Sequence, residues 1–255
     1  MTTRETYRSY VQYGVEDLTQ ETVYSGAPWQ FSDDFVGAGH GAGVPAAGSP
    51  SAGYPWVKKI VGAGPPTVGI PAGVVPGGLM ACTLLSTSEA EEASLYFNDS
   101  LQIDTTRNGC WEWRSLLSVA PSAAGVQAFL GLGTAWVGGP LNLARYMGFL
   151  WNGSGALSVV AKDGAGNTES IAAAPIGGSA ITTDTTTQHY YRISWENQAD
   201  IAFFVDGNRV NAVGSVPWAP TGTNGVFQPW HTVYKPSGTG VATLTMDKTE
   251  GFNGR

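Results

Sequence analysis

The most regular hydrophobic pattern in the chain begins at His189. From there to Trp195 every second residue is aromatic or aliphatic, and this period of two indicates a β-strand with one buried face. The alternation stops in a polar turn and resumes over residues 201–205. Asp206-Gly207 then supplies the positive φ that a tight hairpin needs. A further short strand follows, so the segment is predicted to be an antiparallel meander.

Short apolar or alternating runs continue through the chain from residue 79 onward. Clusters of Gly, Pro, Asn and Asp separate nearly all of them, and no long helical pattern lies between them. Many short strands of this kind indicate an all-β sandwich, and the absence of a long internal repeat disfavours propellers and solenoids. Besides the meander, the predicted strands are residues 79–86, 94–97, 110–119, 127–133, 147–152, 157–162, 227–235 and 241–247.

Residues 1–30 have a different pattern and are predicted to be an N-terminal arm, followed by a sandwich domain over residues 31–255. Several apolar residues of the arm fall at helical spacing, although Gly14 weakens a helix, so the arm is predicted to be a short helix or an extended segment. Residues 37–53 form a Gly/Pro-rich loop with almost nothing to bury. The arm carries more aromatic surface than a free tail should expose. Its predicted partner-binding residues are Tyr7, Tyr10, Tyr13, Leu18, Tyr24 and Trp29.

Composition supports a β-rich chain. Its 255 residues include 35 glycines and 15 prolines, which long helices do not tolerate. Charged residues make up only 13%, and the net charge of −7 argues against a nucleic-acid partner because phosphate binding needs clustered basic residues. Residues 60–85 are uncharged, but their prolines and glycines would interrupt a helix and disfavour a membrane span. The N-terminus lacks the apolar stretch of a secretory signal.

The two cysteines are too few for a disulfide scaffold. Cys82 and Cys110 both fall within predicted strands, so two buried free thiols are expected. A bridge between them remains the alternative, since it depends on geometry that the sequence does not give.

The order and spacing of several segments resemble those of a known family. Over roughly residues 55–250 the chain resembles the concanavalin A-like (laminin-G-like) jelly-roll proteins found among the virion components of tailed bacteriophages. The resemblance implies a two-sheet sandwich on a phage particle, most often without enzymatic activity, and the arm lies outside it. The resembling segments are WVKKIVGAGPPTV (56–68), LSTSEAEEASLYF (85–97), WEWR (111–114), the Asp163-Gly164 turn, YRISW (191–195), FFVDG (203–207) and QPWHTVYKPSGTG (228–240).

The same fold hosts glycoside hydrolases, so the carboxylates need a direct test. Retaining enzymes hold two carboxyl groups about 5–5.5 Å apart, which Glu-x-Asp-x-Glu on one strand would achieve. The nearest string starts at Glu89, where Glu89 and Glu91 could share a face, but no acid follows at residue 93. We therefore expect a solvated polar turn before a strand at 94–97, and no catalytic residue. Glu112 points away from its tryptophan neighbours and is predicted to pair with Arg114.

Metal and sugar sites have weak support. His40, His189 and His231 have no ligand-type residue at zinc spacing beside them. Residues 163–169 offer oxygen donors for calcium, but an ordinary hairpin turn fits them better. No metal site and no cofactor is predicted. Three of the nine tryptophans, Trp111, Trp113 and Trp195, are expected in the core. The better candidates for a contact surface are Trp56, Trp136, Trp151, Trp218 and Trp230.

These observations predict a non-enzymatic phage virion structural protein, a capsid decoration or cement protein assembled in the host cytoplasm. Its partners would be the major capsid protein or other virion subunits, with a homo-oligomer possible and no nucleic acid or membrane involved. The alternative from another class is a tail-fibre or tail-associated module that binds host glycans. A glycoside hydrolase is disfavoured because the carboxylate pattern is missing.

Overall fold

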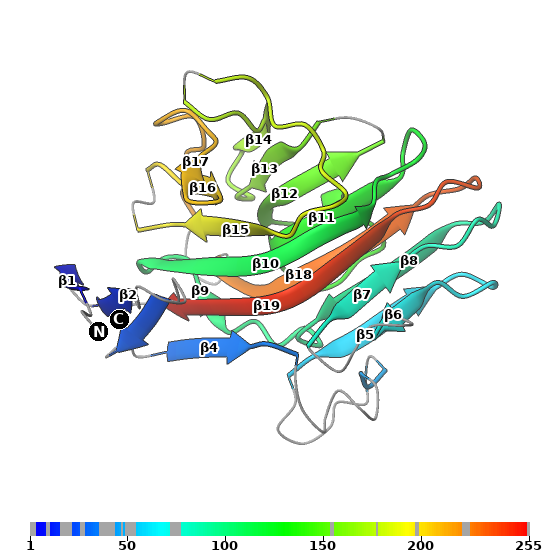
Figure 1. Cartoon of the computed structure of the whole chain (residues 1–255), viewed down its shortest axis with the longest axis horizontal. Coiled ribbons are helices and arrows are strands. Elements are labelled where there is room, and N and C mark those ends of the chain that lie inside the picture. Colours follow the sequence, from blue (N-terminus) through cyan, green and yellow to red (C-terminus); the bar gives the residue numbers. More distant parts are fainter. Residues whose placement is uncertain are drawn as a thin grey trace.

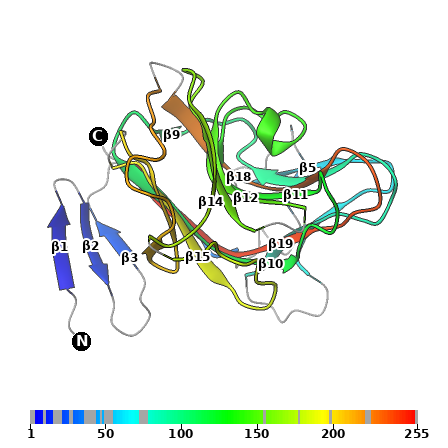
Figure 2. The same ribbon diagram turned by 90° about the horizontal axis from the view of Figure 1, so that it is seen from above.

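The computed structural model contains a sandwich of two antiparallel sheets and a smaller third sheet (Figures 1 and 2). The sandwich is a concanavalin A-like jelly roll, as the sequence predicted, and the described residues contain no α-helix. Side chains are described from residue 31 onward. The described residues are 4–8, 11–15, 22–25, 29–35, 44–46, 48, 55–71, 78–153, 156–176, 178–196, 199–220 and 225–253.

One layer, called sheet I, has two long strands at its centre that pair along most of their length (Figure 1). Its strands follow the order β17-β16-β15-β10-β19-β7-β6, and β4 pairs with the free end of β19. They are β4 (Trp29–Asp33), β6 (Thr67–Gly69), β7 (Met80–Thr83), β10 (Gly109–Val119), β15 (His189–Ser194), β16 (Ala202–Val205), β17 (Asn208–Arg209) and β19 (Thr243–Asn253).

The other layer, sheet II, follows the order β14-β13-β12-β11-β18-β8-β5, and β9 pairs with one end of β18. A short 3-10 helix, η1 (Pro140–Asn142), lies on the side of sheet II that faces away from sheet I (Figure 2). The strands are β5 (Val57–Val61), β8 (Glu91–Tyr96), β9 (Ile103–Asp104), β11 (Gln127–Gly133), β12 (Tyr146–Asn152), β13 (Ser158–Lys162), β14 (Thr168–Ala172) and β18 (Val226–Lys235).

The main core fills the space between the two sheets, and alternation places its residues there. On β10, Trp111 and Trp113 are fully buried while Glu112 and Arg114 point outward. A second, smaller apolar cluster lies on the outer face of sheet II, beneath the segment that carries η1. Its buried members are Val57, Tyr96, Phe129, Leu143, Tyr146, Leu150, Val160 and Trp230.

The predicted meander is confirmed as β15, β16 and β17. Asp206 and Gly207 have φ angles of 50° and 77°, as a hairpin with two left-handed residues requires. The other predicted strands are present with shifted ends. Sequence reasoning missed β4, β5, β6, β9 and β14, each of which has five residues or fewer, too few to show a clear alternation.

The predicted polar turn before residue 94 is wrong, because β8 begins at Glu91 and both of its first two glutamates are buried. Glu91 points inward and lies 3.3 Å from the Lys235 ammonium, and neither side chain is exposed. Lys235 Nζ also donates to the carbonyls of Leu85 and Thr87, each at 2.6 Å. The pair therefore holds the β7–β8 connection onto the end of the core.

The arm contains strands rather than a helix. β1 (Arg4–Arg8), β2 (Val11–Val15) and β3 (Thr22–Ser25) form a three-stranded antiparallel sheet of their own. The extended alternative is therefore the correct one for these residues. β4 spans the boundary predicted at residue 30, and most of the predicted loop at 37–53 lies outside the described residues.

Candidate functional site

The outer face of sheet II, called the covered face, carries a buried glutamate on β8, one strand in from the β5 edge. Glu92 projects from β8 and is 1% exposed. Its carboxylate accepts hydrogen bonds from Ser94 Oγ at 2.5 Å, Trp136 Nε1 at 2.8 Å and the Gly139 amide at 3.1 Å. Burial raises the pKa of Glu92, although these three donors oppose the rise. The carboxylate is therefore used to fasten the segment that crosses this face.

The crossing segment is the connection between β11 and β12. Trp136 is half-buried against the second apolar cluster, and its backbone amide donates to Asp99 at 2.7 Å. The Lys59 ammonium lies 4.5 Å from the centre of the Trp136 ring. Gly148 leaves room for the Phe129 side chain to pack on this face, since a Cβ at residue 148 would lie 2.5 Å from the Phe129 ring. The face is consequently filled by the chain itself.

The covered face also gives the test for a glycosidase triplet. Glu92, Ser94 and Tyr96 occupy alternate positions of β8 on one side of the sheet. These are the positions that the three acids of Glu-x-Asp-x-Glu would take, and only the first is an acid. The sequence test began at Glu89 and so missed this register. The signal was available, because the apolar Ala93 and Leu95 mark the opposite, inward side.

The outer face of sheet I, called the open face, has a different glutamate at its centre. Glu112 on β10 lies directly opposite Glu250 on β19 and Arg192 on β15. The predicted pairing of Glu112 with Arg114 is wrong: Arg114 Nη1 lies 3.0 Å from Asp247, at the β-bulge where β10 and β19 lose register. The bulge brings Asp247 within reach, and no sequence pattern specified it.

Two acids in register make Glu112 electrostatically unusual. Partial burial and the neighbouring Glu250 charge together raise the pKa of Glu112 from 4.5 to about 7. Glu250 is held by Lys248, whose Nζ lies 3.2 Å from its carboxylate. The Arg192 guanidinium stacks 4.2 Å from the centre of the Phe204 ring rather than on either acid. The Arg192 and Lys248 charges oppose the rise of this pKa, but within the described part of the chain neither forms an ion pair with Glu112.

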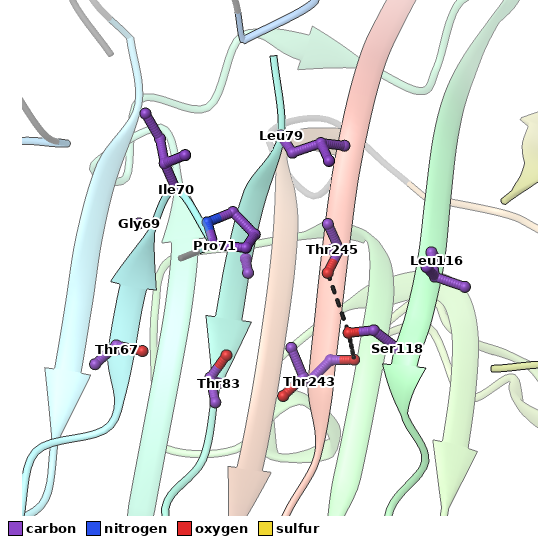
Figure 3. Close-up of a pocket in the computed structure, with 11 residues that line it drawn as sticks. Thr67, Gly69, Ile70, Pro71, Leu79, Thr83, Leu116, Ser118, Thr243 and Thr245 are labelled. Carbon is purple, nitrogen blue, oxygen red and sulfur yellow. Dashed lines mark hydrogen bonds between the residues drawn. The ribbon is translucent and has the colours of Figure 1, made fainter. Parts of the chain in front are cut away.

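A shallow hollow of about 600 Å³ lies on the same face, toward the β6 edge (Figure 3). Thr67, Thr83 and Thr243 form a row across β6, β7 and β19, and their hydroxyls have no hydrogen-bond partner among the described residues. Ser118 Oγ lies 3.4 Å from the Thr243 carbonyl and 3.2 Å from Thr245 Oγ1. Leu79 and Leu116 border the hollow (Figure 3). Its lining is uncharged and includes neither Glu112 nor Glu250.

The histidines do not come together. His231 is fully buried beside Trp56 and Trp113, and burial lowers its pKa to about 3. His189 lies at the surface, with Nδ1 2.6 Å from Asp206 and Nε2 3.3 Å from Asp184. His40 lies outside the described residues. Within the described part of the chain, no three His, Cys, Asp or Glu side chains are placed to hold a metal ion.

Residues 163–167 form the hairpin turn between β13 and β14, and residues 168–169 begin β14. Burial alone would raise the pKa of Asp163, but hydrogen bonds from Ala165 at 2.7 Å and Asn167 at 2.6 Å outweigh it and lower that pKa. Its carboxylate is therefore occupied within the turn, as in an Asx-turn. Cys82 and Cys110 are both buried thiols, and no bridge joins them.

The tryptophan prediction is half right. Trp111, Trp113 and Trp195 are core residues as expected, with no exposed surface. Trp56, Trp151, Trp218 and Trp230 are also buried, so the contact role predicted for them is wrong. Of the five, Trp136 alone keeps some exposed surface.

The predicted partner-binding residues are not tested at the level of side chains. Tyr10 and Leu18 lie outside the described residues. Tyr7, Tyr13, Tyr24 and Trp29 fall in β1 to β4, where the structure describes only the backbone.

Solved structures with the same fold include a β-glucanase from Bacillus licheniformis, which is 13% identical with a TM-score of 0.53 over 89% of this chain and 98% of that one. A protein of unknown function from Shewanella oneidensis MR-1 is 10% identical with a TM-score of 0.58, covering 88% and 86%. The carbohydrate recognition domain of Emp47p is 13% identical with a TM-score of 0.52, covering 83% and 95%. Identities this low establish the fold alone.

No family model matches the chain, and no curated protein matches its sequence. No helix in the described part of the chain has the length and hydropathy to cross a membrane.

Proposed function

We propose that this chain is a non-catalytic structural protein of a tailed-bacteriophage virion, a decoration protein that binds neighbouring capsid subunits. The support from sequence is the ordered set of segments over residues 55–250 that resembles virion jelly rolls. The support from structure is the placement of the arm, whose first three strands pair only with one another. An appendage outside the sandwich suits a protein that reaches a neighbouring subunit during assembly in the host cytoplasm.

The covered face carries the non-catalytic part of the proposal. A retaining glycosidase needs two carboxyl groups about 5–5.5 Å apart on either side of a bound sugar. Glu92 has Ser94 and Tyr96 at the following alternate positions, and its oxygens accept hydrogen bonds from Trp136 and the Gly139 amide, so the chain itself covers the carboxylate. Glu112 and Glu250 are opposed acids, but the hollow on their face excludes both. Binding therefore fits these surfaces better than hydrolysis.

The arm would supply the contact to the capsid. Ordering a free chain costs about 1–2 kcal/mol per residue in backbone entropy, so an arm needs a surface to pack on. Its aromatic residues, with Tyr7, Tyr13 and Tyr24 among them, are the kind of side chain that anchors protein interfaces. We assign the contact with the capsid to these residues.

A second candidate function, binding of a host glycan by a tail-associated module, is favoured by the hollow on the open face. Its three unpaired threonine hydroxyls and uncharged lining would suit a neutral, hydroxyl-rich ligand. The lining contains no aromatic ring for a sugar to stack on, which is why this function ranks second.

The test compares the full chain with a chain that lacks residues 1–25, which removes β1 to β3 and keeps β4 of sheet I, using capsid particles stripped of the protein. We expect the shortened chain to keep its cooperative melting transition and to lose particle binding. Undiminished binding by the folded sandwich would contradict the decoration role and favour the glycan-binding alternative. The full chain should release no reducing sugar from laminarin, and release that Glu92→Gln abolished would contradict the non-catalytic assignment.

A further inference from the structure

The open face contains two charged groups that are neighbours but lack close partners. Glu112 and Arg192 lie directly opposite each other on β10 and β15. Within the described part of the chain, no hydrogen bond or ion pair engages the Glu112 carboxylate. Arg192 Nε is a buried donor without an acceptor there. Unsatisfied polar groups this close to the surface are costly in the free molecule, because partial burial removes water without supplying a partner.

The adjacent charges on the same face are paired within the chain. Lys248 contacts Glu250 at 3.2 Å, and Arg114 contacts Asp247 at 3.0 Å. The contrast singles out Glu112 and Arg192 as the groups that a partner would satisfy. They have opposite charges and lie on neighbouring strands of one sheet. The partner must therefore present a positive group to Glu112 and a negative group to Arg192.

We propose that the open face binds a second copy of this chain, related by a two-fold axis that runs parallel to β10 and β15 and midway between them. Such an axis places β10 of one copy opposite β15 of the other. Glu112 of each copy then faces Arg192 of the partner subunit, and the reverse contact forms at the same time, as in any isologous interface. Each copy supplies an ion-pair partner for a group that forms no ion pair within its own chain.

The next pair of residues along the same strands fits the same axis. Arg114 and Tyr190 are again opposite each other in register, and the Arg114 guanidinium lies 5.8 Å from the centre of the Tyr190 ring in the same copy. The same two-fold axis places Arg114 of one copy over Tyr190 of the partner subunit, so each tyrosine ring gains a second cation. Tyr190 is 44% exposed, one of the larger apolar surfaces on the protein.

The composition of this patch matches what protein interfaces use at their centres. Tyrosine and arginine dominate interface hot spots, and charge complementarity fixes the register of the two partners. Two antiparallel sheet faces can stack in an aligned arrangement, which keeps β10 of one copy over β15 of the other. The contact uses no residue of the arm or of the covered face, so it is independent of the proposed capsid contact.

The test reverses single charges in the full-length protein and measures sedimentation equilibrium at low salt and about pH 8, above the pKa of Glu112. The unmodified chain should dimerise, more weakly as salt rises. Glu112→Arg and Arg192→Glu should each raise the dimer dissociation constant about 100-fold or more, because each places like charges together twice in the dimer. The double variant Glu112→Arg/Arg192→Glu should restore dimerisation, since the two-fold axis again places opposite charges together.

The matched control is Glu169→Arg on β14, at the edge of sheet II, which makes the same charge change away from the open face. It should leave the dimer unchanged. A chain that stays monomeric at the highest soluble concentration would overturn the proposal. So would a double variant that melts like the unmodified chain yet remains monomeric, or a dimer lost equally in the Glu169 control. These readouts do not involve capsid particles, so they separate this contact from the proposed virion role.

Discussion

The outer faces of the two sheets each carry a partly or fully buried glutamate, and the surroundings of the two glutamates differ. Glu92 on the covered face has three hydrogen-bond donors and lies under the β11–β12 connection. Glu112 on the open face has an acid on one side and an arginine engaged with Phe204 on the other. One carboxylate therefore stabilises the fold, whereas the other forms no hydrogen bond or ion pair within the described part of the chain. A buried charge is informative only together with its partners.

The strands themselves show why the faces differ. β12 is buried at every residue from Tyr146 to Trp151, because both faces of sheet II are packed. β10 alternates between buried and accessible residues along most of its length, because only one face of sheet I is packed. The same antiparallel geometry thus supports a structural surface and an available one, according to what covers it.

The largest difference should appear when each glutamate is truncated. Glu92→Ala should lower the free energy of unfolding by about 3 kcal/mol, because it leaves a cavity and removes the acceptor of Trp136 and Gly139. Glu112→Ala is the matched variant on the open face and should be neutral or slightly stabilising. Urea unfolding of both at about pH 8 and high salt, which screens contacts between molecules, measures the contrast. Equal losses would show that the two faces are not distinct.

Two strand glycines give a smaller contrast that does not involve charge. A Cβ at Gly148 would press on the Phe129 ring, so Gly148→Ala should cost about 1–3 kcal/mol by overpacking the covered face. At Gly69, on the open face, an added Cβ has no neighbour within 4 Å. Gly69→Ala should change stability by less than about 0.5 kcal/mol. Thermal melts of the two variants check this, and a marked loss in Gly69→Ala would mean that the open face is covered.

The smallest expected effect is a pH dependence from Glu112. Its pKa rises from 4.5 to about 7 on folding, so between these values the folded chain binds more protons than the unfolded one. The contribution of Glu112 to stability is therefore most favourable below about pH 4.5 and is lost as the pH rises to about 7. Glu112→Gln should remove this component.

The variant should become more stable than the unmodified chain by on the order of 1 kcal/mol above neutral pH, after allowance for solvent screening. Melting temperatures of both proteins across this range provide the measurement. A constant difference at all pH values would show that Glu112 does not titrate in this window.

Much of the architecture could be predicted because it depends on local chemistry. Alternation around Tyr191 and the Asp206-Gly207 pair determined the meander, since side-chain period and turn conformation are properties of neighbouring residues. The tryptophans of β10 could be assigned to the core for the same reason. The apolar runs at 127–133 and 146–151 also carried a signal that went unused: strands without alternation are packed on both faces.

The site could not be predicted in this way, because its contacts join residues far apart in the chain. Glu92 meets Trp136 and Glu91 meets Lys235 only after the sheets have formed, so burial converts an apparently solvated acidic run into two separate structural contacts. Glu112 and Glu250 come into register across two strands that are distant in sequence, and a bulge then assigns Arg114 to Asp247. The sequence alone determined which residues alternate and where the chain turns. Only tertiary packing decided which charges are satisfied, because that depends on strand register and on what covers each face.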